Sequence, residues 1–139
     1  MKKLLLLSAM AIVAVSCGQK NKAHISGTFS GISKDTIYLE MITTKGVSVV
    51  DSTVTNQQGN YSFAVTIPEA APTFYNLVYK QSRIPLIVSP GEKLKVNSMC
   101  DLRHNYTVEG SDESQLLKEF NTLYTNGVSA LDSLGNLYA

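Results

Sequence analysis

The strongest constraint on the fold is a period of two in apolar residues, which recurs in short runs between residues 24 and 110. The clearest run covers residues 61–67, in which every second side chain is large and apolar. Successive side chains of a β-strand point to opposite faces, so this pattern predicts a strand with one buried face. Similar runs occupy residues 24–29, 36–42, 47–55, 73–80, 83–89, 92–96 and 106–109.

Seven or eight short strands separated by turn-forming residues predict a mainly β fold, an antiparallel β-sandwich spanning residues 24–110. The compact turn at residues 56–60 contains Gly59 and predicts a hairpin that joins the runs on either side of it. Pro85 has no backbone N–H to donate, so its run is expected at a sheet edge or at a strand start.

The apolar period changes to 3.6 at Ser111, which is followed by Asp112 and Glu113. A hydroxyl N-cap with acidic residues in the first turn predicts a helix start, and we expect residues 111–139 to form a C-terminal amphipathic helix. Its apolar stripe consists of Leu116, Leu117, Phe120, Leu123, Tyr124, Val128, Leu131, Leu134 and Tyr138. Such a stripe needs a partner: either the helix folds back on the sandwich, or the chain is truncated before a further domain.

The N-terminus has the layout of a signal peptide over residues 1–16, with Lys2 and Lys3 before a short apolar run and small residues before Cys17. The run is too short for a spanning helix, which needs about 20 residues. The segment Ala14-Val15-Ser16-Cys17 resembles a bacterial lipobox, which implies acylation of Cys17, with palmitate among the chains, and a tether over residues 17–23. The alternative is cleavage nearby, with Cys17 incidental.

A lipid on Cys17 would anchor the chain to the outer (or inner) membrane of a cell envelope. The tether has no acidic run, which favours a position facing the periplasm. Lys and Arg number 12 against 11 Asp and Glu, and no basic run remains after the signal, so nucleic-acid binding has no electrostatic support. Acylation of Cys17 would leave Cys100 without an intramolecular disulfide partner.

No residue set predicts catalysis, a metal site or a cofactor. His24 and His104 lie far apart in sequence, with no cysteine or carboxylate at ligand spacing. Three hydroxyl residues follow aspartates in triplets that resemble an O-glycosylation sequon of envelope proteins: Thr36, Ser52 and Ser133. Five tyrosines on predicted strands favour cross-strand packing over a groove for a glycan or peptide: Tyr38, Tyr61, Tyr75, Tyr79 and Tyr106.

Several short segments also occur in a familiar order: DTIYL at 35–39, VDST at 50–53, QGNYSF at 58–63, YNL at 75–77, PLIVSPGE at 85–92, VEGS at 108–111 and LLKEF at 116–120. Together they resemble an N-terminal domain of unknown function in envelope lipoproteins that carry a thioredoxin-like domain. Those proteins are described as thiol:disulfide interchange proteins or as members of the alkyl hydroperoxide reductase/thiol-specific antioxidant superfamily. The resemblance places their chemistry in a downstream Cys-x-x-Cys, which this chain lacks, so it transfers no catalytic residue.

Three functions follow as expectations. The first is a lipid-anchored accessory or binding domain of the envelope, without catalytic activity, whose partners are the membrane and an envelope protein or glycan. The second is the N-terminal fragment of a thiol-disulfide oxidoreductase lipoprotein. The third is a small glycan- or peptide-binding lipoprotein.

Overall fold

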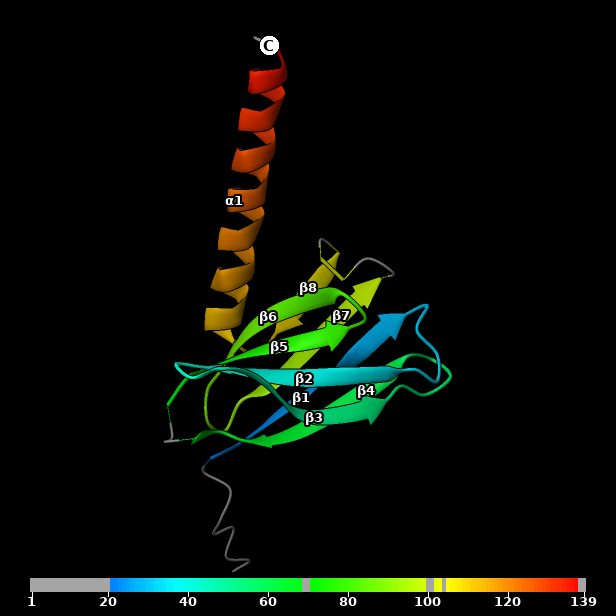
Figure 1. The fold of residues 1–139 in the computed structure, drawn as a ribbon. Coiled ribbons are helices and arrows are strands. Elements are labelled where there is room, and N and C mark those ends of the chain that lie inside the picture. Colours follow the sequence, from blue (N-terminus) through cyan, green and yellow to red (C-terminus); the bar gives the residue numbers. More distant parts are fainter. Residues whose placement is uncertain (1–20, 69–70, 100–101, 104, 138–139) are drawn as a thin grey trace, which may run out of the picture.

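The computed structural model describes residues 21–68, 71–99, 102–103 and 105–137, which form a β-sandwich with one long helix projecting from it (Figure 1). The strands are β1 (Lys22–Ser30), β2 (Thr36–Thr43), β3 (Gly46–Val54), β4 (Asn60–Thr66), β5 (Thr73–Tyr79), β6 (Ser82–Val88), β7 (Lys93–Met99) and β8 (Tyr106–Glu109). The helix is α1 (Asp112–Leu137).

The eight strands divide equally between two sheets, with the orders β4-β1-β7-β8 and β3-β2-β5-β6. Neighbouring strands are antiparallel except for β1 and β7, which run parallel. The predicted sandwich and its C-terminal helix are therefore confirmed, with one parallel pair inside an otherwise antiparallel pattern. Pro85 lies on β6, an edge strand, as its missing N–H predicts.

The predicted hairpin between residues 47–55 and 61–67 is wrong, because β3 and β4 belong to different sheets. β3 pairs with β2, whereas β4 pairs with β1. The turn between them is the compact one expected: the Asn56 side chain accepts hydrogen bonds from the N–H groups of Gln58 and Asn60. Gly59 has a φ of 84°, and a Cβ there would overlap the carbonyl oxygen of Phe29, so this turn needs glycine.

The core lies between the two sheets and is built from the alternate residues that the period of two identifies. Tyr61, Phe63 and Val65 of β4 are buried, and the ring of Tyr61 lies 4.6 Å from that of Phe29, centroid to centroid. The Tyr61 hydroxyl donates a 2.7 Å hydrogen bond to the carbonyl of Val96. Among the described residues, every buried side-chain polar atom has a hydrogen-bond partner, as is usual for a well-packed core.

Candidate functional site

The helix α1 is fixed to the sandwich by two serines that bind the backbone of the edge strand β6. The Ser114 hydroxyl donates to the carbonyl of Ile87 at 2.7 Å and accepts from the Ile87 N–H at 2.9 Å. The Ser111 hydroxyl donates to the same carbonyl at 3.1 Å and accepts from the Ser114 N–H, which makes it the predicted N-cap. These contacts satisfy edge groups of β6 and set the direction in which α1 leaves the sandwich.

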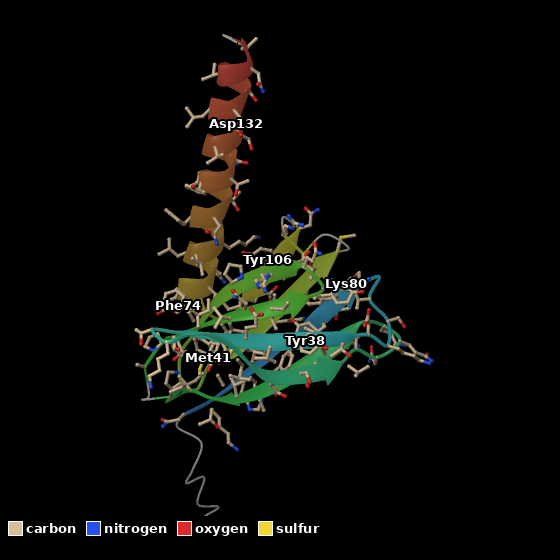
Figure 2. The ribbon with its side chains drawn as sticks, viewed as in Figure 1. Tyr38, Met41, Phe74, Lys80, Tyr106 and Asp132 are labelled. Carbon is tan, nitrogen blue, oxygen red and sulfur yellow. The ribbon has the colours of Figure 1, made fainter. Side chains whose placement is uncertain are left out.

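The side of α1 that faces the sandwich is polar. Lys118 is half-buried and its Nζ lies 5.3 Å from the centre of the Tyr106 ring. Two open grooves between α1 and the β8 side of the sandwich are lined mainly by polar helix residues, which include Lys118, Asn121, Thr122 and Thr125, and by one apolar helix residue, Leu123. In Figure 2, Tyr106 lies beside the lower turns of α1, whereas Asp132 lies on the part of α1 that rises clear of the sandwich.

The apolar side of α1 is exposed. The exposed fractions are 67% for Leu116, 63% for Phe120 and 70% for Leu131, and Ser114 is the one buried residue of this helix. Phe120 and Tyr124 stack on each other on the helix surface, with ring centroids 6.4 Å apart. Of the two alternatives for the apolar stripe, packing against the sandwich is therefore wrong. The strand β6 holds the first turns of α1, and mainly polar side chains of α1 face the sandwich.

A second apolar surface covers the outer face of the sheet β3-β2-β5-β6. Phe74 of β5 is 49% exposed and pairs with Ile87 of β6, so the surface reaches the start of α1 (Figure 2). We call this set the outer sheet patch, and its exposed members are Tyr38, Ile42, Val47, Val49, Val54 and Phe74.

A carboxylate lies near the middle of this outer face. Glu40 accepts hydrogen bonds from the Arg83 guanidinium at 3.1 and 3.3 Å, and from the Asn76 amide at 3.3 Å. Arg83 holds the pKa of Glu40 below its usual range, although partial burial opposes this shift. The hydrogen-bond partners of Glu40 come from β5 and β6, so this ion pair links three neighbouring strands. The pKa of Glu40 is lowered, whereas a general acid needs a raised pKa.

The predicted attachment residues lie in different places. Cys17 and Cys100 are outside the described residues. Thr36 is half-buried and its N–H donates to Asp35, whereas Ser52 is exposed on the edge strand β3. Ser133 is exposed on α1, where its hydroxyl donates to the carbonyl of Ser129.

The strand tyrosines separate into packing and surface groups. Tyr61, Tyr75 and Tyr106 are buried, and burial raises the pKa of each hydroxyl. Tyr79 is half-buried and donates a 2.8 Å hydrogen bond to Asp35, which lowers the pKa of that carboxyl. Only Tyr38 of the five is exposed, so the packing interpretation holds for most of them, and they do not line one groove.

Sequence reasoning missed the residues that position the surface: Ser114, Glu40 and Arg83. A serine inside a helix and a charged pair 43 residues apart carry no local periodic signal. In the part of the chain that the structure describes, no three His, Cys, Asp or Glu residues come together as metal ligands would. Within the same residues, no helix is both long enough and apolar enough to span a membrane.

Comparison with known proteins assigns the chain to a family. A search of curated proteins finds no match. Residues 23–117 match the family described as Domain of unknown function (DUF4369), and this stretch runs from the start of β1 into the first turns of α1. It therefore includes the whole sandwich and the serines that hold the helix, so the chain belongs to the DUF4369 family.

Proposed function

We propose that this protein is a lipid-anchored, non-catalytic module of the cell envelope that binds a protein partner through the apolar side of α1. The observation that carries the proposal is the orientation of this helix. Its polar side lies over the sandwich and its apolar side is exposed from Leu116 to Leu137. Large contiguous apolar surfaces on a folded protein are characteristic of interaction sites.

The arrangement of the chain suits a module tethered at its N-terminus. The start of β1 lies across the sandwich from the tip of α1 (Figure 1). The helix has 26 residues and extends for about 39 Å at 1.5 Å per residue. A lipid on Cys17 would therefore hold the sandwich near the membrane and direct α1 away from it.

The anchor is tested by metabolic labelling with an alkyne-bearing fatty acid. We expect the wild-type chain to be labelled and Cys17→Ala to lose all label, because the acyl chains need this thiol. Cys100→Ala is the matched control and should remain labelled. Persistent labelling of Cys17→Ala, or an unlabelled wild-type chain, would contradict the lipid anchor.

A second candidate is the N-terminal part of a thiol-disulfide oxidoreductase lipoprotein. The resemblance described above suggests it, and the uncovered apolar side of α1 favours it, since a following thioredoxin-like domain could cover that side. DNA sequence beyond the codon of Ala139 tests this idea. A continuous or frameshifted thioredoxin-like frame with Cys-x-x-Cys would support it, and its absence would remove it.

A further inference from the structure

The exposed side of α1 carries a heptad pattern. Apolar positions and one glycine follow one another at alternating intervals of three and four residues: Leu117, Phe120, Tyr124, Gly127, Leu131 and Leu134. We call this set the α1 seam. A second row recurs every seven residues beside it and consists of Leu116, Leu123, Ala130 and Leu137. A sustained 3-4 spacing is the pattern by which helices pack along one another with interlocking side chains.

The charge pattern around the α1 seam favours identical partners. From residue 120 to 137 the one charged side chain is Asp132, which lies off the seam. Two copies can therefore approach along the seam without like charges facing each other. A membrane surface fits less well, because interfacial helices carry Lys or Arg on their polar side and this stretch has neither.

A partner would also stabilise the helix. Gly127 and Gly135 each weaken it by about 1 kcal/mol relative to alanine. Three hydroxyls bond to the carbonyl four residues earlier, which also favours bending: Thr122, Thr125 and Ser133. Its principal contacts with the sandwich are to β6 and β8, at its first turns. Helices with little tertiary packing are marginal in water, so cover for the α1 seam would supply the missing stability.

We propose that a second copy of this chain covers the α1 seam, with the two helices parallel and in register. Seven large apolar side chains of the α1 seam and the second row are more than half exposed. At roughly 100 Å² each they supply about 700 Å² per chain, close to the amount that a standard protein interface buries on each partner. In each chain the sandwich lies beside the polar side of α1, so a pair joined along the seams would place the two sandwiches on opposite sides of the helix pair.

This inference names the partner of the proposed binding module, and therefore rests on the proposed role of α1 but not on the lipid. Its first test is the mass of the full chain in detergent, measured by sedimentation over a range of concentrations. The wild-type chain should be dimeric. Leu131→Glu combined with Leu134→Glu should weaken the dimer by roughly 100-fold, since two buried leucines are lost from each chain. Ser129→Glu, on the opposite side of α1, should leave the mass unchanged.

A substitution that strengthens the dimer tests whether the two helices meet along the α1 seam. A side chain at Gly127 would meet open space in a single chain, so Gly127→Leu should fill a gap in the seam and tighten the dimer by roughly tenfold. Ser129→Leu is the control, because it removes a weak helix former without touching the seam. Equal tightening by both variants would overturn the seam as the interface.

Disulfide trapping tests the parallel arrangement in cells. In a Cys100→Ser background, Leu131→Cys should form a symmetric cross-linked dimer on mild oxidation, whereas Ser129→Cys should not. Equal cross-linking at both positions, or a monomeric wild-type chain, would overturn the inference. A monomer that still carries the fatty-acid label would refute self-association alone, while a dimer without label would refute the anchor alone.

Discussion

The sandwich and α1 are both built from regular apolar patterns, but the apolar residues are buried in the sandwich and exposed on α1. The sandwich encloses them: Ile25, Phe29, Leu77 and Leu86 are completely buried. The helix exposes almost all of its own, from Leu116 to Leu137. The difference shows that periodicity specifies which side of an element is apolar, while burial depends on whether a second surface is available to cover it.

The largest expected effect is the difference in the free energy of unfolding between two variants, each of which removes one phenylalanine from one region. Phe29→Ala should lower the free energy of unfolding by about 3–5 kcal/mol, because it opens a cavity beside Tyr61. At concentrations at which the chain is monomeric, Phe120→Ala should change the unfolding of the sandwich by less than about 0.5 kcal/mol, because that ring is exposed in a single chain. Urea titrations followed by tyrosine fluorescence measure both. Similar losses would show that α1 is part of the cooperative unit of the sandwich.

The second effect concerns the junction between the regions. Ser114→Ala removes two hydrogen bonds: the Ile87 N–H loses its serine acceptor, while the Ile87 carbonyl keeps the Ser111 hydroxyl, and the expected cost is about 1–3 kcal/mol. Hydrogen exchange should show faster exchange at Ile87 and in the first turns of α1. Ser129→Ala, where the serine is exposed, should leave both unchanged. Unaltered exchange in Ser114→Ala would show that the Ser114 hydroxyl does not hold the helix.

The smallest expected effect concerns the ion pair between Glu40 and Arg83 on the outer face of the sheet β3-β2-β5-β6. Because Arg83 depresses the pKa of Glu40, the folded state binds this proton less readily than the unfolded state. The stabilisation is therefore complete above the usual glutamate pKa of about 4.3 and is lost as pH falls through the depressed value. Glu40→Gln should lower stability by about 1 kcal/mol at neutral pH. Between about pH 5 and 3 this variant should lose less stability than the wild-type chain.

Thermal unfolding of the wild-type chain and of Glu40→Gln across this pH range measures the difference in their stability. Parallel pH profiles would contradict the assignment of the pair as a stabilising contact. Arg83→Met is a useful companion variant, because it removes the charge while it retains an apolar stem over the sheet.

Much of the fold was predictable because its signals are local. The alternation in residues 61–67 identified the buried face of β4, and the sequence Ser111-Asp112-Glu113 identified the start of α1 within one residue. The candidate surface was predictable only in part. The stripe on α1 was visible as a pattern, but the fixing of Ser114 to Ile87 joins residues 27 apart in the chain and has no periodic signature.

The sequence by itself determined the period of each element and the apolar composition of one side of α1, and it restricted Pro85 to a sheet edge or a strand start. These properties follow from neighbouring residues, whose spacing alone decides which side chains share a face. Only the tertiary structure decided that β4 pairs with β1 in one sheet rather than with β3, that β1 and β7 run parallel, and that the polar side of α1 faces the sandwich. These are choices among partners that differ in long-range packing and hydrogen bonding, and no local pattern encodes them.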